Sequence, residues 1–219
     1  VERRRDSSRD RPPPPVVERR TSTAEKRRDS ASGEAKPPPP SRKLPTVFVF
    51  DREKSHKIVH VSDGGMHAEI TEDGDSEHSA ILAPALPRSG THYVEFLLEN
   101  TGTPECYIQI GVCTGEHDVR GGTPAYQSAS GWCFSCHNGN LLHFDQGSKY
   151  SRKLPRTGDR VGLLVDMDLH SLEMYINGEG QGIMVDGLPS TLHFVVDGGD
   201  QGQAVRITGA TKPITRMVK

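Results

Sequence analysis

The sequence predicts an all-β fold over residues 46–210, either a β-sandwich or a barrel. Short runs in which apolar and polar residues alternate recur through this region, and period two is typical of strands that place one face on a core. Turn-forming residues separate the runs, and no stretch of ten or more residues has a convincing helical pattern. Many short antiparallel strands indicate a sandwich or barrel. The spacings show no regular repeat, which argues against a propeller.

Residues 1–45 differ in composition from the rest of the chain. They carry 13 Lys/Arg against 7 Asp/Glu, hold nine of the 16 prolines and contain no aromatic residue. Such a segment cannot bury enough apolar surface to offset its ordering entropy. We therefore predict a disordered basic tail over residues 1–45, a folded domain over 46–210 and a short C-terminal tail over 211–219. The tail has a net charge of +6 and the remainder −8, so reversible docking of the tail on the domain is a further hypothesis.

The tail contains two kinds of motif. Three Arg-Arg-x-Ser sequences end at Ser7, Ser22 and Ser30 and resemble sites of basophilic protein kinases. Each phosphate would add about −1.5 to −2 charge units at neutral pH. The proline runs Pro12–Pro15 and Pro37–Pro40 favour polyproline II, which SH3, WW or profilin-like modules recognise, although a stiff spacer is the favoured interpretation.

Five alternating runs define the predicted strands. The residues that we expect on their core faces are, in order, Val94, Phe96 and Leu98; Cys106, Ile108, Ile110 and Val112; Val161, Leu163, Val165 and Met167; Leu172, Met174 and Ile176; and Leu192, Phe194 and Val196. Turns are expected between the strands at residues 63–65, 73–75, 100–102, 138–140, 177–178 and 197–199, where Asp, Asn and Gly supply positive φ or local side-chain bonds.

Ordered motifs within this region resemble those of the SPRY (B30.2-type) domain family. The matching segments are Gly90-Thr91-His92-Tyr93-Val94-Glu95-Phe96, Ile110-Gly111-Val112, Gly131-Trp132 with Asn138-Gly139 and His143, Gly158-Asp159-Arg160-Val161-Gly162, and Leu172-Glu173-Met174-Tyr175-Ile176-Asn177-Gly178, followed by the closing strands around Phe194 and Val205. The resemblance covers about residues 48–208. One departure is Val94, where the family usually has Trp, and another is the run Met174-Tyr175-Ile176, where it usually has Phe.

The resemblance implies a bent two-sheet antiparallel sandwich of the concanavalin-like jelly-roll type. It also implies a protein–protein interaction module that binds a short partner segment through loops at one end, as an adaptor or substrate-recognition domain. Loops vary without disturbing a rigid scaffold, which suits them to binding. A lectin-like carbohydrate-binding sandwich is the alternative function.

Three loops near the implied binding end carry the candidate partner-binding residues. These are Glu72, Asp73 and Asp75 in the first loop, Asp118, Arg120 and Tyr126 in the second, and Asp197 and Asp200 in the third. An acidic surface with Tyr126 as an exposed anchor would favour a basic partner segment, since aromatics are enriched at binding hot spots. The alternative is that the acidic loops only keep the domain soluble.

No catalytic residue, metal site or cofactor is expected. Cys133 and Cys136 stand in a C-x-x-C spacing with His137 and His143 nearby, but a strand would point the two thiols to opposite faces. Neither Cys106 nor Cys113 has an evident thiol partner. No Gly-x-Ser-x-Gly elbow is present. The Gly-rich run 178–182 lacks the Lys-Ser/Thr of a phosphate loop, which favours a hairpin loop.

The sequence also bears on location and partners. It contains no apolar window of the ~18–20 residues that span a bilayer, so no membrane contact is expected. Four cysteines in 219 residues favour a reducing compartment, which makes the predicted location intracellular, cytoplasmic or nuclear. A nucleic-acid partner is disfavoured, because acids interleave the basic clusters of the tail and aromatics are missing from it.

Overall fold

The computed structural model of the protein describes residues 46–74, 76–103 and 105–209. Asp75 and both predicted tails lie outside these ranges, and with them Ser7, Ser22, Ser30 and the proline runs Pro12–Pro15 and Pro37–Pro40. The tail boundaries, the phosphorylation sites and tail docking therefore stay predictions. Among the described residues, no helix is both long and apolar enough to cross a membrane.

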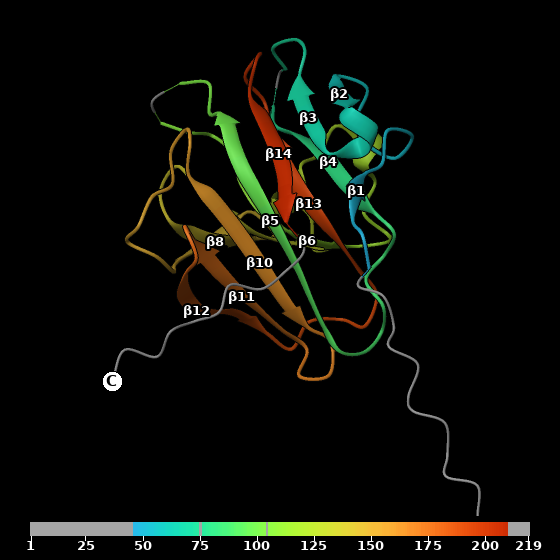
Figure 1. The fold of residues 1–219 in the computed structure, drawn as a ribbon, viewed down its shortest axis with the longest axis vertical. Coiled ribbons are helices and arrows are strands. Elements are labelled where there is room, and N and C mark those ends of the chain that lie inside the picture. Colours follow the sequence, from blue (N-terminus) through green and yellow to red (C-terminus); the bar gives the residue numbers. More distant parts are fainter. Residues whose placement is uncertain (1–45, 75, 104, 210–219) are drawn as a thin grey trace, which may run out of the picture. The chain divides into compact units, whose positions relative to one another are not determined.

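Two seven-stranded antiparallel sheets form the described part of the chain (Figure 1). The first sheet has the order β1 (Val49–Phe50), β4 (His78–Ala83), β13 (Leu192–Gly198), β6 (Gln109–Thr114), β7 (Gly131–Ser135), β8 (Asn140–His143) and β9 (Gln146–Lys149). The second has the order β12 (Glu179–Asp186), β11 (Ser171–Ile176), β10 (Arg160–Asp166), β5 (Thr91–Asn100), β14 (Ala204–Gly209), β3 (His67–Ile70) and β2 (Val59–Ser62). Three short 3-10 helices complete it: η1 (Asp63–Gly65), η2 (Val119–Gly121) and η3 (Ala125–Gln127). The predicted all-β sandwich is confirmed.

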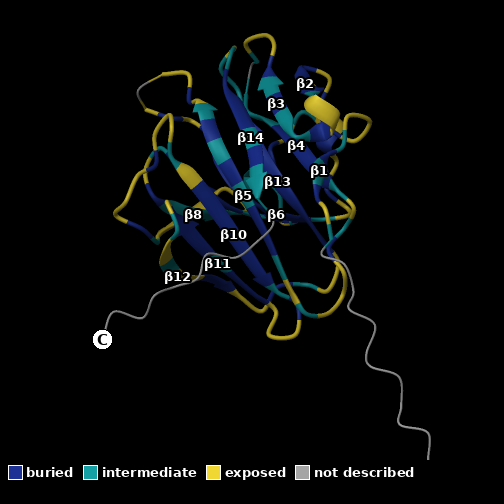
Figure 2. Ribbon diagram, in the orientation of Figure 1, coloured by how far each residue is buried: buried dark blue, intermediate teal, exposed yellow. Residues whose placement is uncertain are grey.

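The core lies between the inner faces of the two sheets, and the strands are mostly buried while the connecting loops are exposed (Figure 2). All the core-face residues predicted from the five alternating runs are buried there. Val94, at the position where the family usually has Trp, is 1% exposed and belongs to this core. Alternation of apolar residues thus identified the inner faces correctly, because successive side chains of a strand point to opposite faces of the sheet.

Asn177 and Gly178 form the tight turn between β11 and β12. Their φ values are +52° and +77°, the left-handed region that Asn and Gly tolerate best. The prediction of a hairpin loop over residues 178–182 is wrong beyond Gly178, because β12 begins at Glu179. Two register shifts against β11 accommodate the glycine-rich run of β12. Such bulges interrupt the alternation of apolar and polar residues, so a strand that contains them is not predicted from that pattern.

The turn predicted at residues 197–199 is also displaced. Asp197 and Gly198 are the last residues of β13 and pair with Ser79 and His78 of β4. The chain turns only afterwards, over residues 199–203, where Gly202 has a φ of +82°. Asp197 therefore lies on the sheet itself, not at a loop tip.

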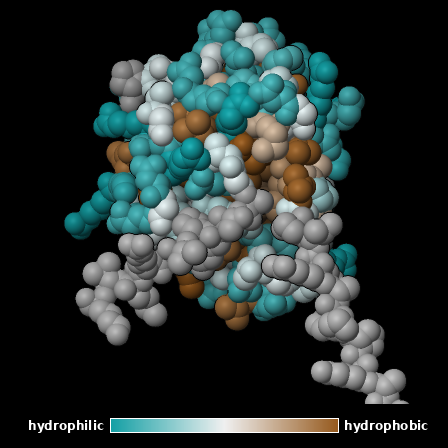
Figure 3. Space-filling view, in the orientation of Figure 1, coloured by the Kyte–Doolittle hydropathy of each residue, from teal (hydrophilic) through white to brown (hydrophobic). Residues whose placement is uncertain are grey.

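The η2–η3 segment, residues 115–130, covers the outer face of the first sheet. Val119 and Ala125 pack there on a small apolar cluster formed by Ile81, Cys113, Cys133 and Val195, with Tyr126 at its margin. The outer face of the second sheet instead carries a patch of Tyr93, Leu164 and Tyr175. Figure 3 shows that second face, where hydrophobic residues lie near the centre and hydrophilic ones around the upper rim. Among the described residues, the η2–η3 segment is thus a loop fixed across the outer surface of the first sheet.

Candidate functional site

The structure brings together three loops that are far apart in sequence. We call residues 71–74 and 76–77, the η2–η3 segment and residues 199–203 the loop cluster. The Gly74 amide donates to the Gly199 carbonyl at 3.2 Å, and the Gln201 amide donates to Asp73 Oδ1 at 2.8 Å. Ser76 Oγ donates to the Gly122 carbonyl at 3.2 Å. These bonds hold the three loops as one surface at one end of the first sheet.

A buried carboxylate fixes the η2–η3 segment to the sheet. Asp197 is 0% exposed, and Ser79 Oγ donates to its Oδ1 at 2.5 Å. Its Oδ2 accepts from the Tyr126 amide at 3.4 Å, and the Ala125 amide also donates to the carboxylate. Burial raises the pKa of Asp197 to about 6, although these hydrogen bonds oppose the rise. Asp197 therefore acts as an anchor for η3.

His117 extends this network from the loop side. Its Nε2 lies 3.2 Å from Ser79 Oγ, and its Nδ1 lies 3.5 Å from Ser128 Oγ. Burial lowers the pKa of His117. The three side chains of Asp197, Ser79 and His117 do not form a nucleophile with its base, because the hydroxyl is buried and donates to the carboxylate rather than to the imidazole. The arrangement supports a structural role.

Most of the predicted acidic binding residues have partners within the domain. Asp73 caps Gln201, Asp118 Oδ1 accepts from the Arg120 and Gly121 amides, and Asp200 Oδ2 accepts from Gln203 Nε2 at 3.1 Å. Glu72 is exposed. The expectation that Asp197 faces a partner is wrong, since β13 and η3 bury it completely.

Tyr126 is partly buried rather than an exposed anchor. Its hydroxyl donates to Glu77 Oε2 at 3.1 Å, and burial raises its pKa to about 12. Phe144, which the sequence analysis did not single out, is the more exposed aromatic side chain, with 62% of its surface accessible. It lies at the β8–β9 turn, and the amide of the next residue, Asp145, donates to the Tyr126 carbonyl at 3.1 Å.

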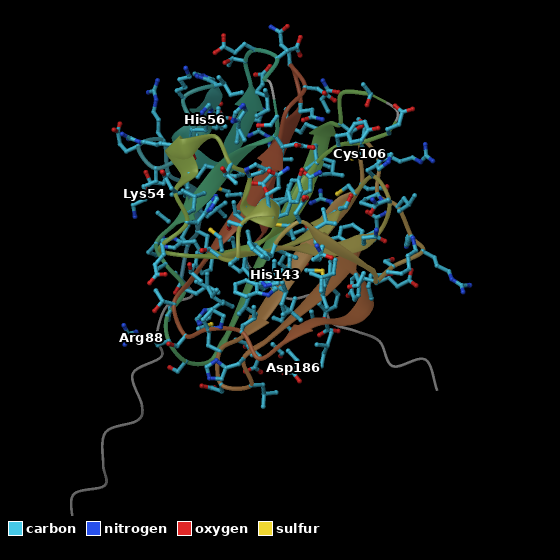
Figure 4. All side chains as sticks on the ribbon, turned by 180° about the vertical axis from the view of Figure 1, so that it is seen from behind. Lys54, His56, Arg88, Cys106, His143 and Asp186 are labelled. Atoms are coloured by element: carbon cyan, nitrogen blue, oxygen red, sulfur yellow. The ribbon has the colours of Figure 1, made fainter. Side chains whose placement is uncertain are left out.

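Arg120, which belongs to the η2–η3 segment of the loop cluster, lines two cavities. The first, of about 400 Å³, is lined by Arg52, Ser55, His56, Lys57 and Arg120. The second, of about 320 Å³, is lined by Glu53, Lys54, Ile81, Gly115, His117, Asp118, Val119, Arg120 and His193. Figure 4 shows Lys54 and His56 toward one end of the domain and Arg88 toward the other. The first cavity is thus lined by three cationic side chains, of which only Arg120 was among the predicted binding residues, while the second also carries Glu53 and Asp118.

Comparison with protein families assigns this architecture. The SPRY domain family matches residues 91–209, more than half of the chain. The chain belongs to the SPRY domain family. The SPRY domains are generally protein–protein interaction modules and generally non-catalytic. The family match includes β7, the η2–η3 segment and most of the loop cluster.

Solved structures agree with this assignment. The SPRY domain of human HERC1 superimposes with a TM-score of 0.62 at 18% identity, covering 72% of this chain and 96% of that one. The TRIM65 PSpry domain gives 0.59 at 13% identity, covering 74% and 92%, and a human SPRY domain gives 0.55 at 17% identity, covering 74% and 96%. Identities this low show the shared fold alone. A comparison with curated protein sequences gives no match.

The thiols and histidines of this SPRY domain do not converge on a metal site. Cys133 and Cys136 belong to different apolar clusters, as a strand requires, while His137 stacks on Tyr107 and His143 stacks on Trp132. Within the described ranges no group of three or more His, Cys, Asp or Glu is placed to hold a metal ion.

The expectation that Cys106 lacks a thiol partner is wrong. Its side chain hydrogen-bonds with that of Cys136, and this bond lowers the pKa of Cys106. Burial raises the pKa of Cys136 well above its usual range. The sequence hid the contact because Cys106 lies before β6 and has a φ of +52°, which directs it differently from a strand residue.

Proposed function

We propose that this SPRY domain recognises a short segment of a partner protein through the loop cluster, and serves as a non-catalytic adaptor or substrate-recognition module. One observation carries the proposal: three loops distant in sequence are hydrogen-bonded into one surface and anchored on a sheet through Asp197. Binding by a pre-organised surface loses little conformational entropy on association. A rigid loop surface on a sandwich is therefore suited to recognition.

The partner-facing residues follow from exposure. Glu72, Asp73, Asp118 and Arg120 are exposed, and Tyr126 and Asp200 contribute partly buried surface. A basic partner segment stays a prediction, which Glu72 and Asp73 support. Asp73 keeps its negative charge although its Oδ1 accepts from the Gln201 amide. This bond leaves the carboxylate fewer lone pairs with which to bind a partner.

The test is capture of partners by the full chain, with variants that spare the fold. The Tyr126→Ala variant removes the ring but keeps the backbone bonds of Tyr126 to Asp197 and Asp145. Tyr107→Ala is the matched control, because Tyr107 is a 39% exposed tyrosine outside the loop cluster. We expect partners that bind wild type and Tyr107→Ala but not Tyr126→Ala, identified by mass spectrometry and confirmed with purified protein. Equal capture by all three chains, or binding only to a glycan array, would contradict the proposal.

Phe144 provides a second and independent prediction. A Phe with a φ of +49° occupies a left-handed conformation that costs side chains about 1 kcal/mol, and here it also exposes a large ring to water. A ring held in this way contributes little to the fold and is a suitable anchor for a partner. We expect Phe144→Gly to leave the free energy of unfolding unchanged or to raise it by up to about 1 kcal/mol, while weakening partner binding at least about tenfold.

Urea unfolding and a binding titration with the captured partner measure the two effects. Leu169→Gly is the control, since Leu169 is 70% exposed and lies in the turn between β10 and β11 of the second sheet, whereas Phe144 lies in the first. It should leave binding unchanged. A Phe144→Gly chain that unfolds more easily and binds normally would assign Phe144 to the fold instead.

A further inference from the structure

We propose that the cavity lined by Arg52, Ser55, His56, Lys57 and Arg120 is a binding site for a phosphorylated serine or threonine side chain of a partner segment. The inference rests on the proposed function, because it names the chemistry that one part of the loop end recognises. The cavity encloses about 400 Å³, which admits a side chain bearing a phosphate group.

The lining is cationic. Arg52, Lys57 and Arg120 carry three positive charges and His56 adds an imidazole, whereas the Ser55 hydroxyl already donates to the Asp51 carbonyl at 2.7 Å. None of the lining residues is acidic. Burial lowers the pKa of His56, the charges of His78 and Lys57 lower it further, and Glu72 opposes this lowering. The three positive charges repel one another because no carboxylate lines the cavity between them, and an anion bound in the cavity would offset that repulsion.

One of the donors, Arg120, is held in place before any ligand binds. An Nη2 hydrogen of Arg120 bonds to the Glu53 carbonyl, which ties η2 to the loop after β1. That loop is itself closed by Asp51, whose Oδ1 accepts from the Glu53 and Lys54 amides at 3.0 and 3.1 Å. A pre-ordered guanidinium group such as that of Arg120 loses less entropy when it binds an oxyanion.

His56 supplies an observation independent of charge. Its side chain lines the cavity, the residue is 8% exposed, and its Nδ1 is buried with no hydrogen-bond partner among the described residues. Buried polar atoms without a partner are rare in folded proteins, so this one calls for an explanation. The ring cannot turn freely toward another group, because it stacks on His78 with centroids 4.0 Å apart. Because Nδ1 is closed to solvent, a ligand oxygen reaches it only if the ring shifts, so the inference depends on the charges of the lining.

Phosphate matches this lining better than a carboxylate does. A phosphorylated side chain carries about −1.5 to −2 charges and three acceptor oxygens, whereas a carboxylate carries one charge and two oxygens. Three cationic side chains and a ring nitrogen would remain under-neutralised around a single carboxylate. Arginine clusters that recognise phosphorylated segments use the same chemistry.

The test uses the full chain, with O-phospho-L-serine and inorganic phosphate as probes, and follows backbone amide NMR signals. We expect saturable shifts at residues 52–57 and at Arg120. The double variant Arg52→Gln/Lys57→Gln, which changes two exposed side chains, should weaken phosphoserine binding at least about tenfold, since a hydrogen bond to a charged group contributes about 1.5–3 kcal/mol. Arg88→Gln is the matched control, because it removes the same charge from an exposed residue toward the other end of the domain (Figure 4).

Reading shifts at residues 52–57 excludes phosphate that binds only to the arginines of residues 1–45. Equal affinity for L-glutamate and O-phospho-L-serine would overturn the phosphate assignment, and so would tighter binding of a single-stranded RNA that is lost in the double variant. Unchanged binding in Arg52→Gln/Lys57→Gln would overturn the site. If capture depends on Tyr126 while phosphoserine fails to shift residues 52–57, the proposed function stands and this inference fails.

Discussion

Replacing Gly131 by Ala is expected to detach η3 from the first sheet and to lower the free energy of unfolding by about 3–5 kcal/mol. A Cβ on Gly131 would lie 2.1 Å from the Ala125 carbonyl oxygen and 2.5 Å from its carbonyl carbon. The clash involves backbone, so the whole η3 turn must move. Its movement withdraws the Ala125 and Tyr126 amides from Asp197, which is then a buried carboxylate without those donors.

Urea unfolding measures the loss, and hydrogen exchange at the amides of residues 124–128 shows where it arises. Gly115→Ala is the matched control in the same loop segment, since the nearest atom to its added Cβ is His193 Nε2 at 4.0 Å. The control should change stability by less than about 0.5 kcal/mol. Normal protection of residues 124–128 in the Gly131→Ala chain would show that η3 does not depend on this close approach.

Asp197→Asn is expected to remove a pH dependence of stability. The pKa of Asp197 is about 6 in the folded chain and 3.8 when the carboxyl group is free in water, as in the unfolded chain, so the folded protein holds a proton that the unfolded chain releases between these values. The wild type therefore loses stability as pH rises from about 4 to about 6. The total loss is on the order of 3 kcal/mol, from about two pKa units at 1.36 kcal/mol each.

The measurement is the difference in free energy of unfolding between wild type and Asp197→Asn at pH 4.5 and at pH 7. Groups shared by both chains, including His117 with its lowered pKa, largely cancel in that difference. The wild type should lose stability relative to the variant as pH rises. A difference that stays constant across this range would mean that Asp197 titrates near its ordinary pKa in spite of its burial.

The fold was predictable where burial alone decides side-chain placement. Val94, Phe96 and Leu98 occupy the core because side chains of a strand alternate between the two faces of its sheet, and one of these faces is buried. This placement does not depend on which strand pairs with β5. Prediction failed at Asp197 and Gly198, where Asp and Gly suggested a turn but pairing with β4 extends the strand. The carboxylate is tolerated there because loop amides and Ser79 reach it, which is a tertiary contact that local sequence does not reveal.

The site was less predictable than the fold. The three acidic loops could be proposed together because their family resemblance placed them at one end, but their capping bonds could not. Asp118 and Asp73 are engaged with backbone amides whose positions depend on the folded loops. The cavity at Arg52 and Lys57 escaped notice because it also needs Arg120, more than sixty residues later in the chain. The exposure of Phe144 depends on the β8–β9 turn, which the sequence analysis did not place.

The edge strands of the two sheets are poorly suited to pair with a strand of another chain. β1 has two residues, β2 and β9 have four each, and the longer border strand β12 is bulged twice against β11. Short or irregular borders resist edge-to-edge association. Strand addition, the recognition mode that reads mainly main-chain groups, is thereby disfavoured for this domain. Discrimination between ligands must then come from side chains, so that exchanging a few tip residues would change what the domain selects without altering how it folds.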